Sequence, residues 1–413
     1  MNFDVIIIGA GAAGMMCAAQ AGQRGRHVLL IEHVSKLGER IRISGGGRCN
    51  FTNREVSAAN FLSQNPHFCR SALAQYSQRD FIALVERHHI AYHEREHGQL
   101  FCIDSAKRII DMLKRECDQG KVQWAMPCKV ESVQPLASSP SNHDGARFSV
   151  HTTQGTIRCQ SLVIASGGLA APALGATPFG YQIAAQFALP VIAPKPALVP
   201  LALAPESLTP LQPLSGLSIE VVTKVAGGKR AFREQVLITH RGLSGPAILQ
   251  ISSYWQMQEY AKQEYAKSGA KKQPISIALL PGLDVEAWLA QHRHAKALLA
   301  NLLAEKLPRR FAHEWCELHG WTKPMSELSN KEMNAITLAL QGWPLMPAGT
   351  LGYNKAEVTL GGVDTRALNS KSMEAEAVPG LFFIGEVVDV TGWLGGYNFQ
   401  WAWSSGWVAG QAV

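Results

Sequence analysis

The residues with the clearest chemical meaning lie near the start of the chain, in a glycine-rich turn between two apolar segments. Residues 4–8 form a short run rich in β-branched side chains, which predicts a buried parallel strand. The GxGxxG turn that follows can bring backbone N–H groups and a helix N-terminus to a pyrophosphate. A glycine turn without a ligand is the alternative. The dinucleotide interpretation assigns these residues to the site: Gly9, Gly11, Ala12, Ala13 and Gly14.

An acidic residue after the next apolar segment completes the pattern. Residues 27–31 indicate a second strand, and Glu32 follows it, eighteen residues after Gly14. A carboxylate at this place can accept hydrogen bonds from the ribose hydroxyls of a dinucleotide. A lone GxGxxG is a weak signal, but here the strand, turn, helix, second strand and acid occur together. We therefore expect Glu32 to belong to the same site.

A second glycine-rich segment runs from Ser44 to Asn53 with the sequence SGGGRCNFTN. Three consecutive glycines destabilise a helix or strand, so we expect a loop whose backbone lies against a flat ligand. Arg40, Arg42 and Arg48 can offset phosphate charge nearby. The GxGxxG turn, Glu32 and the SGGGRCNxTN segment together resemble the aminoacetone-oxidase-like, BaiN-type NAD(P)/FAD-dependent flavoproteins.

The resemblance covers essentially the whole chain and implies an α/β fold. This fold is a Rossmann-like two-dinucleotide-fold FAD domain with an inserted β-barrel and a helical subdomain. The first motif would hold the ADP half of FAD, and the SGGGRCN loop would run beside the isoalloxazine. The resemblance implies further cofactor residues beyond Glu32 and the five residues of the first turn. They are Arg40, Ser44, Gly45, Gly46, Arg48, Cys49, Asn50, Val130 and Gly167.

The C-terminal part carries the remaining cofactor motif. Residues 380–384 predict a buried strand that ends in Gly385-Glu386, with Asp389 three residues further. The resemblance places this backbone and these acids at the ribityl and pyrophosphate region. Gly396, Tyr397 and Asn398 then open the last helix, whose N-terminal amides can face the pyrimidine edge of a flavin.

The motifs also suggest the domain organisation. We expect a discontinuous FAD domain made of residues 1–194 and 347–413, because cofactor motifs occur at both ends and not in the middle. Residues 195–282 are strand-like and punctuated by glycine and proline, which predicts an inserted β-rich domain. Residues 283–346 show helical periodicity and predict a helical subdomain.

Composition sets limits on the class of protein. The 413 residues carry 39 Lys and Arg against 32 Asp and Glu, and residues 194–345 alone carry 17 against 12. The excess indicates either a solvated face or a surface for a polyanion such as a nucleic acid. The basic clusters there include these three: Lys224, Lys229, Arg230 and Arg233; Lys267, Lys271 and Lys272; and Lys306, Arg309 and Arg310.

Other signals are absent from the sequence. No apolar stretch reaches the roughly 18 residues of a membrane span. The eight cysteines show no CxxC pair and no zinc spacing, so we expect no metal and reduced thiols. With no export signal visible, we expect a cytoplasmic protein. The oligomeric state is left open.

Two segments of this chain match one subgroup of that family: HGQLFC at residues 97–102 and GEVVDVTGWLGGYNFQWAW at residues 385–403. That subgroup resembles flavin-dependent dihydrouridine synthases of large-subunit ribosomal RNA. Such a reaction needs a hydride at uracil C6 and an acid for C5. Cys49 and Cys102 are candidate acids, with a purely structural role as the alternative for each. Only one GxGxxG is present, so NADH or NADPH would dock transiently. A small-molecule oxidoreductase acting on an amine or enone, and a non-catalytic FAD-containing RNA-binding factor, are the alternatives.

Overall fold

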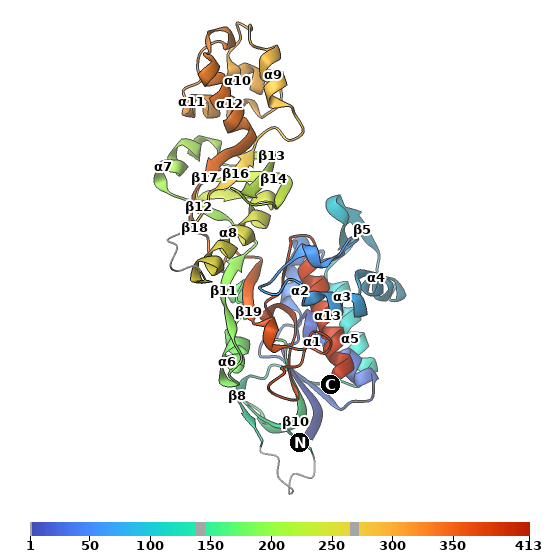
Figure 1. Ribbon diagram of the computed structural model, residues 1–413. Coiled ribbons are helices and arrows are strands. Elements are labelled where there is room, and N and C mark those ends of the chain that lie inside the picture. Colours follow the sequence, from blue (N-terminus) through green and yellow to red (C-terminus); the bar gives the residue numbers. More distant parts are fainter. Residues whose placement is uncertain (1, 137–144, 265–271) are drawn as a thin grey trace. The chain divides into compact units, whose positions relative to one another are not determined.

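The computed structural model describes residues 2–136, 145–264 and 272–413, so Lys267 and Lys271 lie outside the described residues. The chain divides into two compact units. The first contains residues 1–195 and 358–413, and the second contains residues 196–357. The first unit therefore unites both ends of the sequence, which is why blue and red elements occur together in it in Figure 1.

The first unit is built on a seven-stranded sheet in the order β7-β2-β1-β10-β9-β8, with β20 also paired to β10. The pairs among β7, β2, β1, β10 and β20 are parallel, and β9 pairs antiparallel with β10 and β8. The strands are β1 (Asn2–Ile8), β2 (Val28–Ile31), β7 (Gln123–Ala125), β8 (Val130–Pro135), β9 (Phe148–Thr152), β10 (Gly155–Ile164) and β20 (Leu381–Phe383).

The register of the parallel strands positions the glycine turn. Ile8 lies opposite both Ile31 and Ile164, so β1, β2 and β10 end at the same level. The residues after these ends begin with Gly9, Glu32 and Ala165. Residues 5–7 are fully buried, as expected for a strand covered on both faces. The carboxyl edge of this sheet is thus where the first motif meets the segment after β10.

Helices α1 (Ala12–Gln23), α5 (Lys107–Gln119) and α13 (Tyr397–Ala412) belong to this unit. Glycines allow α13 to pack closely on α1, because a Cβ on Gly406 would lie 2.5 Å from the carbonyl oxygen of Ala13. The C-terminal motif is therefore held against the first one. The unit also contains α2 (Glu39–Gly47), α3 (Cys69–Gln75), α4 (Gln78–Arg87) and α6 (Phe179–Gln186), and β11 (Val191–Ala197) pairs with β19 (Val358–Val363).

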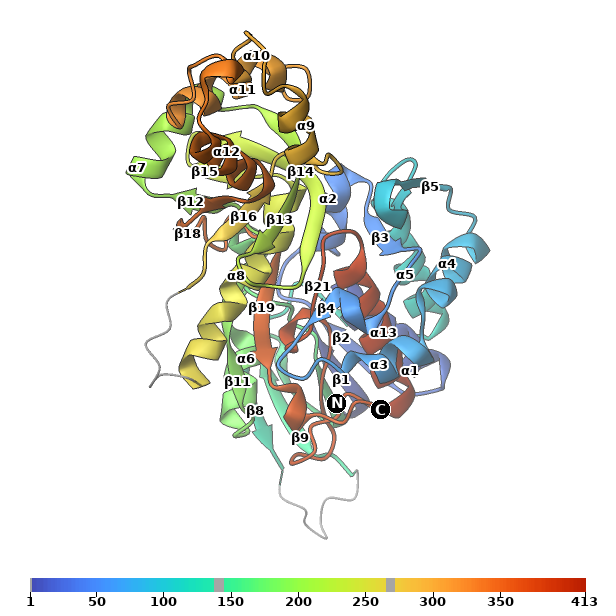
Figure 2. The same ribbon diagram turned by 45° about the horizontal axis from the view of Figure 1, so that its top comes forward.

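Two small sheets complete the first unit. One has the order β3-β6-β5, with β3 (Asn50–Asn53), β6 (Gln99–Cys102) and β5 (Tyr92–Arg95) antiparallel (Figure 2). The other pairs β21 (Thr391–Gly392) with β4 (Phe61–Leu62). Both lie in segments that flank the glycine-rich motifs, so they fix the backbone around the candidate site.

The second unit contains a seven-stranded sheet of order β17-β16-β13-β14-β15-β12-β18. Only Met346 separates β17 from β18, so the chain itself brings the two ends of the sheet together, as in a barrel. Buried Ile219, Val221 and Thr223 alternate with exposed or half-buried residues along β13. The strands are β12 (Leu201–Leu203), β13 (Ser218–Val225), β14 (Ala231–Thr239), β15 (Gly242–Ser244), β16 (Ile275–Ala278), β17 (Trp343–Leu345) and β18 (Pro347–Thr350).

The second unit contains helices as well as this sheet. They are α7 (Pro205–Leu208), α8 (Pro246–Glu264), α9 (Val285–Gln291), α10 (Leu299–Leu303), α11 (Arg309–Leu318) and α12 (Asn330–Gly342). The chain returns to the first unit at Val358 rather than near residue 347, because residues 347–350 form an edge strand of the second sheet. None of the described helices is long and apolar enough to cross a membrane.

Candidate functional site

The three glycines of the first turn have different surroundings. Gly9 has φ +110°, and a Cβ there would lie 2.4 Å from the carbonyl oxygen of Ala165. A Cβ on Gly14 would lie 1.8 Å from the carbonyl oxygen of Gly9. A Cβ on Gly11 would meet no heavy atom within 4 Å. Gly9 and Gly14 therefore serve internal packing, whereas Gly11 keeps a space open at the N-terminus of α1, where unbonded amides can receive an anion.

Glu32 ties the end of β2 to this turn. Its carboxylate accepts hydrogen bonds from the backbone N–H groups of Ala10 (2.9 Å), His33 (2.8 Å) and Val34 (3.2 Å). The structure therefore brings Glu32 to the turn, as the motif predicts, and gives the carboxylate a structural task there. Ala12 and Ala13 are the first residues of α1, and a Cβ on Gly385 would lie 2.9 Å from the Ala13 side chain.

The segment after β10 contributes a second open glycine. Gly167 has φ +73°, and a Cβ there would meet no heavy atom within 4 Å. On its neighbour Gly168, a Cβ would lie 2.4 Å from Thr359 Oγ1 and 2.5 Å from Glu386 Oε1. Gly167 thus borders free space at the same sheet edge as Gly11, while Gly168 packs against the C-terminal motif. Both open positions suit a ligand that approaches the backbone closely.

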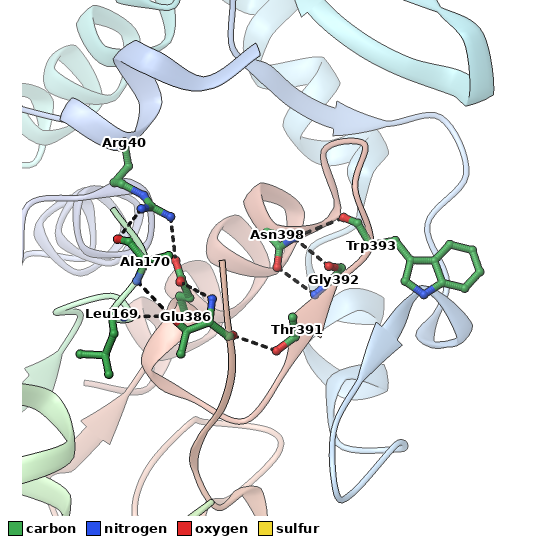
Figure 3. Close-up of polar contacts among 9 residues, drawn as sticks. Arg40, Leu169, Ala170, Glu386, Thr391, Gly392, Trp393 and Asn398 are labelled. Carbon is green, nitrogen blue, oxygen red and sulfur yellow. Dashed lines mark hydrogen bonds and ion pairs between the residues drawn. The ribbon is translucent and has the colours of Figure 1, made fainter. Parts of the chain in front are cut away.

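A polar network joins three parts of the sequence around Glu386 (Figure 3). Arg40 donates a hydrogen bond of 2.7 Å to the carbonyl oxygen of Ala170 and lies 3.6 Å from Glu386 Oε2. Glu386 Oε1 accepts the N–H of Thr359 at 2.9 Å. Thr359 Oγ1 in turn accepts the N–H of Leu169 at 2.8 Å. The predicted residues Arg40 and Glu386 are therefore brought together.

Thr359 is a residue of this network that no sequence motif predicted. It lies in the uniformly buried strand β19 and connects residues 169, 386 and 391, the last through a bond from Thr391 Oγ1 to its carbonyl oxygen. A lone threonine in an apolar run carries no motif. The only available signal was a polar side chain inside a stretch that otherwise predicts a buried strand.

Asp389 is almost fully enclosed by protein. It is 1% exposed, and its Oδ2 accepts the N–H of Gln64 at 2.8 Å and the hydroxyl of Ser63 at 3.3 Å. Burial raises the pKa of Asp389 to about 6, with hydrogen bonds from Gln64 and Ser63 acting in the opposite direction. Its contacts in the structure are to protein groups, so Asp389 holds the segment after β4 next to the C-terminal motif.

The second glycine-rich segment is an interrupted helix rather than a free loop. It forms the end of α2, where Ser44, Gly45 and Gly46 leave helical geometry and Gly45 and Gly46 adopt left-handed φ values of 57° and 67°. A Cβ on Gly45 would lie 2.7 Å from the Phe101 ring, whereas one on Gly46 would meet nothing within 4 Å. Ser44 donates to the carbonyl oxygen of Ile41 at 2.8 Å, and Arg48 is exposed.

The two candidate thiols are buried in the core. Cys49 and Cys102 are both 0% exposed. Burial raises the pKa of Cys49 above its ordinary range and that of Cys102 to about 12, so both thiols stay protonated at neutral pH. In the small sheet Cys102 pairs with Tyr92 and neighbouring Phe101 pairs with His93. Because side chains alternate along a strand, Cys102 lies on the face opposite Phe101 and away from Gly45.

The turn before α13 is fixed by a side-chain amide. Gly396 has φ +92°, and a Cβ there would lie 2.4 Å from the carbonyl oxygen of Thr52. Asn398 accepts the N–H of Gly392 at 2.8 Å and donates to the carbonyl oxygens of Gly392 and Trp393 (Figure 3). Tyr397 is mostly buried, with its ring edge-on to Phe61. The start of α13 is therefore rigidly placed beside β3.

Asn50 and Val130 are the remaining predicted cofactor residues. The side-chain amides of Asn50 and Gln99 are hydrogen-bonded at 3.0 Å across the small sheet. Val130 is buried at the start of β8, and nearby Cys128 donates its N–H to the carbonyl oxygen of Glu32 at 2.7 Å. Val130 therefore lies close in the fold to the end of β2. Among the described residues no group of three or more His, Cys, Asp or Glu side chains is arranged to hold a metal ion.

The geometry fits a dinucleotide cofactor. Gly11, Gly46 and Gly167 each border space that a Cβ would enter without meeting protein, and Gly11 and Gly167 follow strands that end at the same level. The start of α1 supplies amides, and Arg40 supplies a cation that is 35% exposed at the side chain. These are the donors that an anionic pyrophosphate needs.

Comparisons with known proteins agree with this geometry. A family model described as the HI0933-like protein Rossmann domain matches residues 3–412. The chain is 51% identical over 414 residues to the ribosomal RNA dihydrouridine synthase of Escherichia coli (strain K12), and the match covers 99% of this chain and 98% of that protein. It is 45% identical over 412 residues to the protein of the same name from Haemophilus influenzae, with the same two coverages.

A more distant relative has a different name. The chain is 27% identical over 421 residues to the 3-dehydro-bile acid delta(4,6)-reductase of Clostridium scindens, and the match covers 98% of each protein. The similarity thus extends over whole chains and includes proteins named for reactions on quite different substrates.

Proposed function

This chain belongs to the HI0933-like Rossmann-domain family, and we propose that it is an FAD-dependent reductase that converts a uridine of 23S ribosomal RNA to dihydrouridine. The observation that carries the proposal is the 51% identity, over 99% of the chain, to a protein named for that reaction. The open glycine positions and the helix N-terminus beside them support the cofactor part of the proposal.

We assign the binding of FAD to the residues that the structure gathers at the sheet edge. Gly11 and the first amides of α1 would receive the pyrophosphate, and Arg40 would offset its charge. The interrupted helix at Gly45 and Gly46 and the fixed turn at Gly396 would border the isoalloxazine. Bound FAD, once reduced by NADH or NADPH as the transient donor, would supply the hydride.

The reaction removes the C5=C6 double bond of uracil by adding a hydride at C6 and a proton at C5. The protein must therefore orient the base, exclude water and provide the proton. Cys49 and Cys102 are protonated thiols at neutral pH, which is the form an acid needs, but both are fully buried. Substitution of each thiol by alanine distinguishes a proton donor from a residue that only packs.

A direct assay tests the proposal. Purified protein is incubated without oxygen with NADH or NADPH and 23S ribosomal RNA from cells that lack dihydrouridine in it, and the nucleosides are then analysed by mass spectrometry. We expect protein-bound FAD and the appearance of dihydrouridine. FAD-loaded protein that reduces a steroid enone but leaves the RNA unchanged would contradict the RNA substrate and support the small-molecule alternative.

A further inference from the structure

The small sheet β3-β6-β5 has one face turned to the core and one turned outward. Phe51, Leu100 and Cys102 are fully buried on the core side. On the other side, His93 lies opposite Phe101, and Arg95 lies opposite Gln99. The outer face of this sheet is defined by these four residues: His93, Arg95, Gln99 and Phe101.

The outer face adjoins two turns of the proposed flavin site. A Cβ on Gly45 would lie 2.7 Å from Cε1 of Phe101, and one on Gly395 would lie 3.4 Å from Cγ of Gln99. The face is therefore in van der Waals reach of both glycine turns. A substrate bound against these turns would therefore also lie next to the outer face.

Arg95 lies over an aromatic ring. Its guanidinium carbon lies 4.3 Å from the centroid of the Phe101 ring. Its Nε donates a hydrogen bond of 3.2 Å to Nε2 of His93, whose ring lies nearly parallel to that of Phe101. Because Nε2 accepts this bond, any proton on the neutral imidazole is at Nδ1. The Phe101 ring is only 5% exposed, so the exposed Arg95 side chain forms the solvent side of this stack of three side chains.

Among the residues that the structure describes, no acidic side chain neutralises the charge of Arg95. The structure shows no ion pair for Arg95 within the described residues, although it is exposed. Other arginines nearby are paired, as Arg54 is with Glu94 at 2.9 Å and Arg42 with Glu39 at 2.8 Å. The guanidinium therefore offers both a positive charge and a planar side to a partner.

A planar cation backed by an aromatic ring is suited to unpaired nucleotides. Bases of single-stranded RNA stack on arginine planes and aromatic rings, and sequence-specific RNA recognition favours such splayed bases. Extrusion of a target base also leaves its neighbours unstacked. Ile103, which follows β6 directly and is 49% exposed, adds apolar surface beside these side chains.

We propose that the outer face binds an unpaired nucleotide next to the target uridine, with its base stacked on the solvent side of the Arg95 guanidinium. This inference rests on the proposed function, since it names how that same site holds its RNA. It assigns RNA contact to the first unit, in addition to any contact made by the basic clusters of the second.

Binding of the FAD-loaded protein to a fluorescein-labelled single-stranded RNA of 23S sequence, followed by anisotropy, tests the proposal. We expect Arg95→Ala to weaken binding about tenfold, a loss typical of one stacked base. Arg95→Lys keeps the charge but not the plane, so we expect a similar loss with an unchanged salt dependence. Arg79→Ala, which removes an exposed arginine of α4, is the matched control and should bind like the wild type.

The outcomes separate this inference from the proposed function. Wild-type affinity in both Arg95 variants, or in Arg95→Lys alone, would overturn the stacking role. A wild-type protein that binds no ribosomal RNA and forms no dihydrouridine would overturn the proposed function itself. FAD absorbance and the thermal midpoint of each variant show that the fold is intact, and the KM for RNA should rise more than kcat falls in Arg95→Ala.

Discussion

Gly14 packs directly against the carbonyl oxygen of Gly9, whereas Gly11, between them, borders open space. A Cβ on Gly14 would approach that oxygen to 1.8 Å, and one on Gly11 would meet no heavy atom within 4 Å. Two glycines of one motif therefore have different tasks. Gly14 closes the turn on the helix, and Gly11 keeps open the space in which we place the pyrophosphate.

This difference predicts opposite effects of substitution. Gly11→Val should fold normally, since Gly11 has an extended backbone (φ −81°, ψ −165°), but should be colourless because its side chain fills the cofactor space. Gly14→Ala should lose about 1–3 kcal/mol of stability through overpacking. Absorbance at 450 nm and thermal unfolding measure the two effects. Gly349→Val, at another open position, is the control and should keep FAD; a yellow Gly11→Val protein would contradict the assignment.

Asp389 should make stability depend on pH. Burial raises its pKa from 3.8 to about 6, so the folded protein binds this proton more tightly than the unfolded chain does. The resulting stabilisation is fully present below about pH 3.8 and is lost as pH rises through about 6, above which the loss levels off. Asp389→Asn removes this dependence while its amide oxygen can still accept the Gln64 N–H.

The thermal midpoints of the two proteins, measured at saturating FAD across the range from acidic to mildly basic pH, check this prediction. The difference between the two thermal midpoints, Asp389→Asn minus wild type, should rise with pH and then level off above about pH 6. A constant difference between Asp389→Asn and wild type across this range would refute the raised pKa.

The buried thiols give a third prediction. Because Cys102 lies on the core-facing side of its strand and both thiols are 0% exposed, we expect Cys49→Ala and Cys102→Ala to keep FAD and to form dihydrouridine. Each should cost roughly 1 kcal/mol of stability, as for a small buried apolar side chain. Loss of product with full FAD content in either variant would instead identify that thiol as the proton donor.

The basic clusters of the second unit give a fourth prediction. Lys306, Arg309 and Arg310 are exposed at and before the start of α11. Replacing all three by alanine should weaken binding of single-stranded RNA and lower the slope of log affinity against log salt by about 2. Arg233 is paired with Glu220 at 3.1 Å, so Arg233→Ala should change the slope less. Unchanged binding in the triple variant would place the RNA elsewhere.

Local pattern predicted the arrangement of the first motif, because its residues are contiguous in sequence. The strand, the glycine turn and Glu32 are close together in the chain and meet in the structure as the spacing indicates. The three glycines at residues 45–47 were expected to form a loop, and they do break regular geometry, but inside a helix that continues to Gly47.

Contacts between distant segments were not predictable from pattern. Thr359 bonds to Leu169 across 190 residues, and Gln64 bonds to Asp389 across 325. Neither contact has a sequence signature, since each depends on which strands the chain places side by side. The burial of Cys102 was likewise decided by strand register, which a single sequence does not specify.

The central claim is tested most directly by complementation in Escherichia coli that lacks its own ribosomal RNA dihydrouridine synthase. The strain receives this chain, its Gly11→Val variant or an empty vector, and dihydrouridine in purified 23S ribosomal RNA is measured by nucleoside mass spectrometry. We predict that the wild-type chain restores dihydrouridine and that the variant and the vector do not. Absence of dihydrouridine despite abundant, FAD-loaded wild-type protein, in a strain that its own re-expressed enzyme does restore, would contradict the account.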